Sequence, residues 1–323
     1  MRRSLALRLI DTNCAERRTW RPTGRKNSTN AAASRADATS RIRRMTLSFT
    51  KMHGAGNDFV VVDATRTPFR PTPELLGRLT DRRYGVGCDQ VLVVEAPSSP
   101  DVDFNYRIFN ADGSEVGQCG NGARCLARFV REQGLSQADR LRVRTAARVL
   151  TLEHMVDGHI RVNLGLPDFA AAAVPLALPD AERYSVELPG GHTARFQAVS
   201  MGNPHAVITV DDVDRAPVAE WGAALQALAV FPESVNVGFM QVMTPSEVRL
   251  RVYERGVGET LACGSGACAA VVCGIRAGML QSPVTVQVPG GRLAVTWASA
   301  VAGEAAPVWL EGDTETVFRG ELS

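Results

Sequence analysis

No long hydrophobic run occurs in the sequence. None of its stretches reaches the roughly 18 consecutive apolar residues that a membrane-spanning helix needs, so we expect no membrane partner. Hydrophobic residues make up 45% of the chain and charged residues 22%, which is the balance of an ordinary globular protein. The length of 323 residues fits one large domain or two ordinary ones.

The sequence has few closely spaced cysteines. Zinc sites favour Cys-x₂₋₄-Cys pairs, and the closest spacings among the seven cysteines are six residues (Cys119 to Cys125) and five (Cys263 to Cys268 and Cys268 to Cys273), a poor case for zinc, so we expect no metal. The number is odd and no secretory signal precedes them, because the apolar stretch from Leu5 to Ile10 is short and contains Arg8. We therefore expect free thiols in a reducing compartment, and a cytoplasmic protein.

A basic surface for nucleic acid is missing from most of the chain. Residues 1–44 hold 12 Lys and Arg against 3 Asp and Glu, whereas residues 45–323 hold 24 against 31. The larger part is mildly acidic, so we expect no nucleic-acid partner. Residues 1–44 are rich in Arg, Ser, Thr and Ala, and we expect a disordered basic extension there. This extension is either an organelle transit peptide or, the reading we favour, an upstream segment before Met45.

The chain contains an internal repeat. With Cys119 placed over Cys263, an offset of 144 residues, the segment 107–123 lies over 251–267. Shifting the offset to 146 places Gly56-Asn57 over Gly202-Asn203. Matching residues keep nearly the same offset across most of each half. This indicates an internal duplication that gives two similar domains. The identical pairs are Arg107/Arg251, Glu115/Glu259, Cys119/Cys263, Gly120/Gly264, Gly122/Gly266 and Ala123/Ala267.

Each half has the same pattern of elements. Apolar or alternating runs predict strands over 59–63, 89–95 and 102–110. A helix is predicted after each cysteine, with an apolar stripe from Ala123 to Val130 and Gly134 or Gly278 as the stop. We therefore predict an α+β fold of two pseudo-symmetric, strand-rich domains, each wrapped around a central helix, with the active site in the cleft between them. The predicted domains are 45–163, joined by a final strand over about 310–323, and 164–309.

The two Cys-Gly-x-Gly stretches predict acid–base chemistry. Each cysteine precedes a helix, whose N-terminal N–H groups and partial positive charge favour thiolate over thiol and lower the cysteine pKa. The glycines allow close approach, so two facing helix ends form a pocket for a carboxylate. One thiolate can remove an α-proton while the opposite thiol delivers a proton to the other face, as a racemase or epimerase requires. No nucleotide or pyridoxal-phosphate signature is present, and we expect no cofactor.

Other interpretations of the cysteines remain. A lone cysteine is usually a small buried residue, and this is what we expect of Cys88, Cys125, Cys268 and Cys273. A reversible disulfide between the two repeated cysteines is a further alternative, although oxidation is expected to inactivate such a pair.

Seven ordered motifs resemble diaminopimelate epimerases over essentially all of residues 45–323. The motifs are HGAGNDF (53–59), GCDQ (87–90), FNADGSEV (109–116), QCGNGARC (118–125), MGNPH (201–205), NVGF (236–239) and ERGVGETLACGSGACA (254–269). The resemblance implies that the protein interconverts LL- and meso-2,6-diaminopimelate without a cofactor, for lysine and peptidoglycan synthesis. It also suggests a homodimer.

The resemblance further implies the roles of individual residues. Cys119 and Cys263 match the two catalytic cysteines, and His205 and Glu254 match residues that orient the site and tune the thiols. Arg255 suits the distal carboxylate of the substrate. The residues that match the substrate-binding set are Asn57, Gln90, Asn110, Gly120, Asn121, Asn203, Asn236, Glu254, Arg255, Gly264 and Ser265.

Two alternative functions stay open from the sequence. A proline or hydroxyproline racemase shares the fold and the cysteine pair but has no use for a distal-end clamp. A binding protein without turnover does not require the second cysteine. Among single residues, His205 also fits an ordinary strand histidine, and Asn57 and Asn203 also fit turn positions after glycine.

Overall fold

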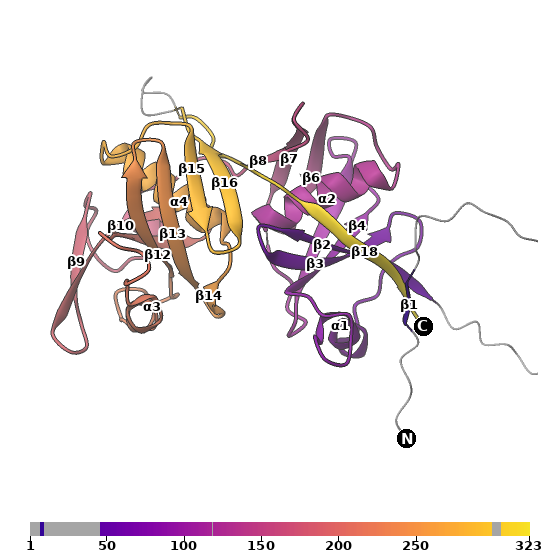
Figure 1. Cartoon of the computed structure of the whole chain (residues 1–323), viewed down its shortest axis with the longest axis horizontal. Coiled ribbons are helices and arrows are strands. Elements are labelled where there is room, and N and C mark those ends of the chain that lie inside the picture. The colour runs from indigo at the N-terminus through magenta and orange to yellow at the C-terminus, as the bar shows by residue number, and fades with distance from the viewer. Residues whose placement is uncertain (1–6, 10–45, 118, 299–304) are drawn as a thin grey trace, which may run out of the picture.

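The computed structural model describes residues 7–9, 46–117, 119–298 and 305–323, which form two lobes (Figure 1). The first lobe contains β2 (Leu47–Gly54), β3 (Asn57–Ala64), α1 (Pro73–Thr80), β4 (Gln90–Glu95), β5 (Phe104–Asn110), α2 (Gly120–Glu132), β6 (Arg140–Arg144), β7 (Val149–His154) and β8 (Ile160–Asn163). The second contains η1 (Ala171–Ala173), β9 (Tyr184–Leu188), β10 (His192–Ser200), β11 (Pro204–Thr209), α3 (Val218–Gln226), β12 (Asn236–Thr244), β13 (Glu247–Glu254), β14 (Gly258–Thr260), α4 (Gly264–Arg276), β15 (Val284–Val288) and β16 (Gly291–Thr296).

The strand pairing repeats between the lobes. In the first, β2 and β5 are antiparallel to the parallel pair β3–β4, and β5 leads through α2 to the hairpin β6–β7. In the second, β10 and β13 are antiparallel to the parallel pair β11–β12, and β13 leads through α4 to the hairpin β15–β16. The α+β fold with two pseudo-symmetric, strand-rich halves is therefore confirmed.

The last two strands tie the lobes together. Strand β17 (Trp309–Gly312) pairs with β16 of the second lobe and with β8 of the first. Strand β18 (Glu315–Leu322) then crosses to the first lobe and pairs with β2, as β9 pairs with β10 in the second lobe. In Figure 1 this terminal segment is the yellow ribbon that passes from one lobe to the other.

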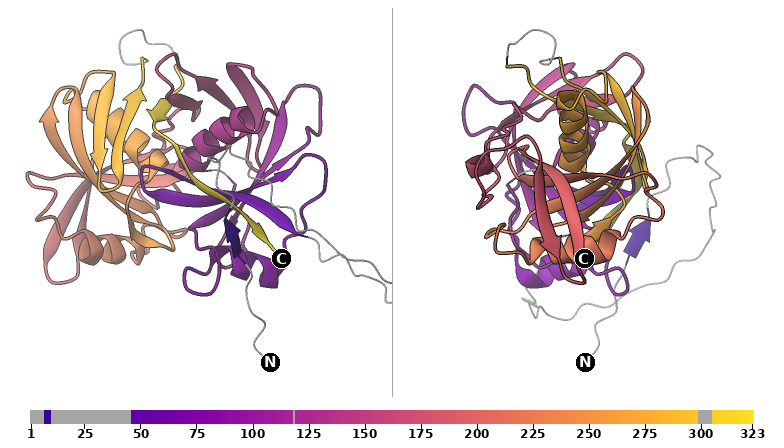
Figure 2. Two further views of the ribbon diagram at one scale, coloured as in Figure 1. Left: turned by 45° about the vertical axis from the view of Figure 1, so that its right-hand side comes forward. Right: turned by 90° about the vertical axis from the view of Figure 1, so that its left-hand side faces the viewer.

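One long helix lies inside each lobe, α2 in the first and α4 in the second (Figures 1 and 2). The predicted stripe of α2 is fully enclosed, since Ala123, Leu126 and Val130 are 0% exposed. Both helices contribute to one continuous apolar core that runs through the two lobes. Gly134 and Gly278 follow the helix ends with φ of 67° and 71°, a left-handed backbone that glycine adopts without strain.

The expected disorder of residues 1–44 is wrong at one point. Leu7–Leu9 form strand β1, whose backbone pairs with Gly320–Leu322 of β18. An edge strand presents unpaired N–H and C=O groups, and an extended segment satisfies them whatever its composition. Residues 1–6 and 10–44, with Cys14, lie outside the described residues. Within the described residues, no helix is long and apolar enough to cross a membrane.

Candidate active site

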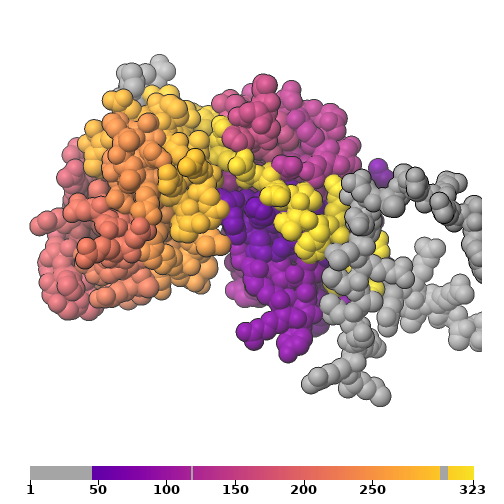
Figure 3. All heavy atoms as spheres, viewed as in Figure 1, coloured from indigo at the N-terminus to yellow at the C-terminus, as the bar shows by residue number. Residues whose placement is uncertain are grey.

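A cleft of about 1300 Å³ is lined by residues of both lobes, and the surface is hollowed between them (Figure 3). Cys119 and Cys263 both line it, so the structure brings the two repeated cysteines to one cavity. Of the other predicted site residues, His205 alone does not line the cleft. Those that do are Asn57, Gln90, Asn110, Gly120, Asn121, Asn203, Asn236, Glu254, Arg255, Gly264 and Ser265.

Each cysteine is the N-cap residue of its helix. Cys119 precedes α2 and Cys263 precedes α4, both with extended backbone conformations. The Cys119 Sγ accepts a hydrogen bond from the Gly122 N–H at 3.3 Å, which is how a cap residue satisfies one of the free donors of a first helical turn. The Cys263 Sγ lies 3.6 Å from the Ser265 Oγ.

Glycine at the first helical position lets the two helix ends converge. A Cβ on Gly120 would lie 3.2 Å from the Leu310 Cδ2, and a Cβ on Gly264 would lie 2.8 Å from the same atom. Leu310 belongs to β17 and is fully buried. One side chain of the strand that joins the lobes therefore packs against both helix N-termini.

Burial raises the pKa of both thiols, contrary to the expected lowering by the helix N-termini. Desolvation raises the pKa of Cys119 to about 11, although the Gly122 N–H opposes this shift. Desolvation also raises the pKa of Cys263 well above its ordinary value, and the nearby Glu254 carboxylate adds to the rise. The helix effect is present for Cys119, but the loss of water around the sulfur outweighs it.

The polar residues of the cleft stand at equivalent strand ends. Asn57 begins β3 and Gln90 begins β4, while in the second lobe Asn203 precedes β11 and Asn236 begins β12. Asn110 ends β5 as Glu254 ends β13. The duplicated topology therefore delivers amides and a carboxylate from both lobes to one cavity.

Hydrogen bonds hold these amides in place. The Gln90 Nε2 donates to the Asn110 Oδ1 at 2.9 Å. The Asn236 Nδ2 donates to the Pro204 carbonyl at 2.9 Å, and its Oδ1 accepts from the Arg255 N–H at 2.9 Å. The amide groups are thus oriented before any ligand enters.

The two charged residues at the end of β13 differ in environment. Burial raises the pKa of Glu254, whose Oε1 accepts a hydrogen bond from the Thr260 hydroxyl. The Arg255 Nη1 donates to the Glu233 carbonyl at 3.0 Å, and its side chain borders the cleft.

His205 does not line the cleft, but it contacts a residue that does. It is 1% exposed in β11, and its Nε2 lies 3.1 Å from the Asn203 Oδ1. Burial lowers the pKa of His205 to about 3, with a smaller contribution from the positive charge of Arg255. The ring is therefore neutral at physiological pH, and its Nε2–H donates to Asn203. The Asn203 Nδ2 in turn donates to the Ser265 Oγ at 3.2 Å.

Several residues of the cleft wall were missed by the sequence analysis. Asp89, Asp112 and Thr260 line the cavity. Asp89 lies in the motif GCDQ beside the predicted Gln90, so its position in a matched motif was the available signal. The other cysteines of the described residues are buried as expected, since Cys88, Cys125, Cys268 and Cys273 are at most 3% exposed.

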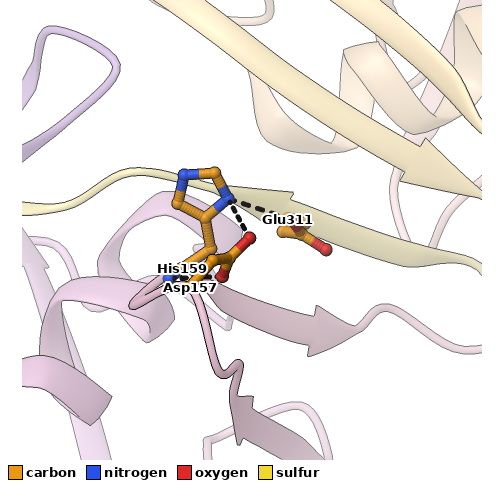
Figure 4. A group of neighbouring side chains, drawn as sticks. All are labelled: Asp157, His159 and Glu311. Atoms are coloured by element: carbon orange, nitrogen blue, oxygen red, sulfur yellow. Dashed lines mark hydrogen bonds and ion pairs between the residues drawn. The ribbon is translucent and has the colours of Figure 1, made fainter.

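A group with the composition of a metal site lies at the junction of the lobes, within the described part of the chain. Figure 4 shows His159 between Asp157 and Glu311, with ligand atoms within 4.8 Å of one another. The His159 Nδ1 lies 3.1 Å from Glu311, and its Nε2 lies 2.8 Å from the Asp313 carboxylate. The hydrogen bond to Glu311 and the surrounding carboxylates raise the pKa of His159, so ion pairing accounts for the arrangement.

Comparison with known proteins identifies the family. The family model described as diaminopimelate epimerase matches residues 49–170 and 197–305. Diaminopimelate epimerase of Chromobacterium violaceum is 53% identical over 279 residues, covering 86% of this chain and 99% of that protein. Diaminopimelate epimerase of Thioalkalivibrio sulfidiphilus is 54% identical over 280 residues, with the same shares of each chain.

Solved structures share the fold at low sequence identity. A hydroxyproline epimerase from Agrobacterium vitis has a TM-score of 0.65 and 14% identity, covering 87% of this chain and 93% of that one. A phenazine biosynthesis protein of the PhzF family from Bacillus anthracis has a TM-score of 0.60 and 19% identity, covering 86% and 99%. At such identities the likeness concerns the fold, whereas the curated relatives match nearly end to end at above half identity, and the chain belongs to the diaminopimelate epimerase family.

Proposed function

We propose that the protein interconverts LL- and meso-2,6-diaminopimelate in lysine and peptidoglycan biosynthesis, through a two-base mechanism at Cys119 and Cys263. One observation carries the proposal: the two cysteines cap equivalent helices and line one cleft. The identity with curated diaminopimelate epimerases selects this substrate over proline or hydroxyproline, because the neighbours with those names share only the fold.

The reaction needs one proton transfer on each face of the α-carbon. The thiolate of one cysteine takes the α-proton, so that the C–H bond breaks and an S–H bond forms. The thiol of the other cysteine gives its proton to the opposite face, so that a new C–H bond forms and a thiolate remains. Negative charge that develops on the substrate carboxylate is stabilised by the N-termini of α2 and α4. The oxidation state of the substrate does not change, so the reaction requires no oxidant or reductant.

Thiolate formation is coupled to substrate binding in this proposal. The free cleft disfavours a charged sulfur, because burial raises the pKa of both thiols. The substrate brings an ammonium group next to the reacting carbon, and a positive charge within a few ångströms favours the thiolate. The thiolate base is therefore formed next to the α-proton that it removes.

The other predicted residues hold the substrate. Glu254 binds an ammonium group, and Arg255 pairs with the distal carboxylate through its planar guanidinium. His205 is assigned a positioning role, since it reaches the cleft through Asn203. Peptide N–H groups at the helix ends and side-chain amides complete the site, from Asn57, Gln90, Asn110, Gly120, Asn121, Asn203, Asn236, Gly264 and Ser265.

Three further features belong to the proposal. The domain division at 163 and 164, with the final strand added to the first domain, is supported by the pairing of β18 with β2. A homodimer through the C-terminal strand is supported by Val317, which is 54% exposed on β18, and sedimentation of the purified protein tests it. A cytoplasmic location is supported by the free state of the six cysteines in the described residues.

The test is exchange at the α-carbon in deuterated water. Purified protein is incubated with LL-diaminopimelate, and proton NMR follows loss of the α-proton signal while chiral chromatography follows the meso isomer. We expect both to proceed together. Parallel incubations with L-proline and trans-4-hydroxy-L-proline are expected to show no exchange. Turnover of proline without diaminopimelate would assign the alternative racemase, and binding without exchange would assign a binding protein.

A further inference from the structure

A chain of hydrogen bonds links an exposed carboxylate of the cleft to a buried arginine. The Asn57 Nδ2 donates to the Asp89 Oδ2 at 2.8 Å. The Asn57 Oδ1 accepts from the Asn121 Nδ2 at 3.4 Å, and the Asn121 Oδ1 accepts from the Arg124 Nη2 at 3.0 Å. Neither Asp89 nor Arg124 is among the residues that the sequence assigned to the site.

This chain passes both cysteines. The Cys119 Sγ lies 3.8 Å from the Asn57 Oδ1, within the distance at which a thiol donates to an oxygen. The Asn121 Nδ2 also donates to the carbonyl of Ala262 at 3.2 Å, and Ala262 directly precedes Cys263. The two amides therefore lie between one thiol and the backbone that carries the other.

Each end of this series of hydrogen bonds can act in only one way, as an acceptor at Asp89 and as a donor at Arg124. An ionised carboxylate only accepts hydrogen bonds and a guanidinium only donates them. Asp89 also accepts from the Arg82 Nη2 at 2.6 Å and from the Asp58 N–H at 3.2 Å. Asn57 must therefore turn its NH₂ group to Asp89 and its carbonyl to Cys119. Asn121 must turn its carbonyl to Arg124 and its NH₂ group to the cleft.

Without Asp89 and Arg124, nothing selects one orientation of the Asn57 and Asn121 amides over the reversed one. The NH₂ group and the carbonyl of an asparagine have nearly the same shape, so sterics alone do not select one orientation. A reversed Asn57 would bring its carbonyl against the Asp89 carboxylate and its N–H groups against those of Asn121. Both contacts are repulsive, so Asp89 and Arg124 at the two ends determine the orientation of the amides between them.

The burial of Arg124 argues for such a role. Its side chain is 0% exposed, and a Cβ added to Gly54 or Gly312 would be in ordinary van der Waals contact with its Nη2, at 3.5 or 3.4 Å. Its Nε and Nη1 have no hydrogen-bond partner among the described residues. A buried charge is weak support for stability, and an apolar side chain is often as good or better. Holding Asn121 is the use that the geometry shows.

We propose that Asp89 and Arg124 are positioning residues, which fix the orientation of the Asn57 and Asn121 amides between Cys119 and Cys263. The inference rests on the proposed function of the two cysteines as the acid–base pair. The Asn57 carbonyl is held as an acceptor for the Cys119 thiol and favours its protonated form, while Asn121 links the two sides of the cleft.

The first variant is Asp89→Asn, which keeps the shape of the side chain but can either donate a hydrogen bond to Asn57 or accept one from it. We expect kcat for diaminopimelate to fall about 10- to 100-fold, as small misplacements in a site do. The pH midpoint of Cys119 alkylation by iodoacetamide, followed by mass spectrometry of its peptide, is expected to move to lower pH. A reversed Asn57 then donates to the sulfur and stabilises the thiolate.

The second variant is Arg124→Met, which is expected to lower kcat by a similar factor and to move the midpoint to higher pH. Asn121 is then free to turn away from Asn57. The Asn57 carbonyl no longer accepts from Asn121, so it binds the Cys119 thiol more strongly. A buried positive charge near the sulfur is lost as well. The ionisable groups that act on Cys119 are Glu254, Arg124, Tyr106 and Cys125. Arg124→Met removes one of them. Asp89→Asn removes none, but the Asp89 carboxylate contributes to the raised pKa of Glu254, so a smaller indirect effect of opposite sign on Cys119 is included in the expected shift.

Matched controls separate orientation from general damage. Asp101→Asn removes an exposed carboxylate that pairs with Arg144, and Arg128→Met removes a half-buried arginine one turn further along α2. Both are expected to keep wild-type kcat and midpoint. Measurements at high salt screen the charge effect of Asp89→Asn but leave the effect of orientation. Arg124→Lys, which still only donates, is expected to restore much of kcat and replaces Arg124→Met if that variant fails to fold.

The outcomes are distinct. Two results together support one connected chain of hydrogen bonds. The alkylation midpoints of Asp89→Asn and Arg124→Met shift in opposite directions, and the fall in kcat of the double variant is smaller than the product of the two single falls. Unchanged midpoints, or shifts of the same sign, overturn it. If the wild type does not epimerise diaminopimelate, the proposed function fails, but the alkylation midpoints still decide whether Asp89 and Arg124 orient the amides.

Discussion

At the scale of single residues, the two cleft cysteines differ from the other described cysteines mainly by position. Cys119 is half-buried and Cys263 is 4% exposed, whereas Cys125 and Cys268 are fully enclosed. What distinguishes Cys119 and Cys263 is that each precedes a helix and borders the cavity. The repeat in the sequence showed this pairing, because it aligned these two and left the others without equivalents.

Replacing either cleft cysteine is expected to abolish epimerisation. Cys119→Ala and Cys263→Ala each remove one of two obligatory proton carriers, so kcat should fall by at least about 100-fold, the usual worth of a positioned acid or base. Cys125→Ala and Cys268→Ala, one in each helix, are the matched controls and should keep activity. NMR exchange assays measure all four. Near-normal turnover in either cleft variant would contradict the two-base mechanism.

The buried His205 gives the stability of the protein a dependence on pH. Burial lowers the pKa of His205 to about 3, whereas an exposed histidine has an ordinary pKa of 6.5. Between these values the unfolded chain binds a proton that the folded chain does not, so stability falls as the pH drops below 6.5. The slope from this residue is at most about 1.4 kcal/mol per pH unit.

Urea unfolding between pH 7 and pH 5 tests this dependence. The His205→Gln variant lacks the titrating ring, so its free energy of unfolding should fall less over this range than that of the wild type. His192→Gln, which removes an exposed histidine of the same lobe, is the control for loss of an imidazole. Equal slopes in wild type and His205→Gln would show that His205 does not stay neutral in the folded state.

At the scale of elements, the helix that follows Cys119 depends on close packing at its first turn. A Cβ on Gly122 would lie 2.3 Å from the Tyr106 Oη and 3.2 Å from a Leu92 methyl carbon. Tyr106 and Leu92 are both buried, so neither has free space to move into. The glycine is needed here for close approach to β5 and β4, and not for an unusual backbone angle.

Gly122→Ala is therefore expected to destabilise the fold by about 1–3 kcal/mol, the usual cost of overpacking a core. The helix end that carries Cys119 should also move, which lowers kcat. Gly77→Ala in α1 is the matched control, because no atom lies within 4 Å of the added Cβ. There the substitution should stabilise by up to about 1 kcal/mol, since alanine favours the helix. Urea unfolding measures both, and shifts of the same sign would contradict this account.

The sequence was sufficient for features that are periodic or repeated. The buried stripe of α2, the glycine stops and the placement of most site residues in one cleft follow from local pattern and duplication. It was insufficient where distant segments set the outcome. The raised pKa of Cys119 depends on how far the folded chain removes water from the sulfur, and the pairing of Leu7–Leu9 depends on the free edge of β18. The roles that we propose for Asp89 and Arg124 depend on contacts that only the folded chain creates.

At the scale of the whole molecule, the strand β17 relates the two lobes. Its pairing with both β8 and β16 makes the strand network continuous from one lobe to the other. Its Leu310 packs against the first glycine of α2 and that of α4. We therefore expect the junction of the lobes to influence the separation of the two thiols, although neither thiol belongs to β17.

This arrangement predicts that Leu310→Ala affects activity beyond its effect on stability. Removing the buried side chain should cost about 2–5 kcal/mol, as for other leucines of a core. It should also free the helix ends to change their separation and lower kcat about 10- to 100-fold, because the reacting groups are misplaced. Leu152→Ala in β7 is the matched control, since Leu152 is equally buried but packs within the first lobe. Both variants are assayed at a temperature at which circular dichroism shows them folded. If Leu310→Ala keeps the kcat of Leu152→Ala, the junction holds the lobes together without setting the geometry of the cysteine pair.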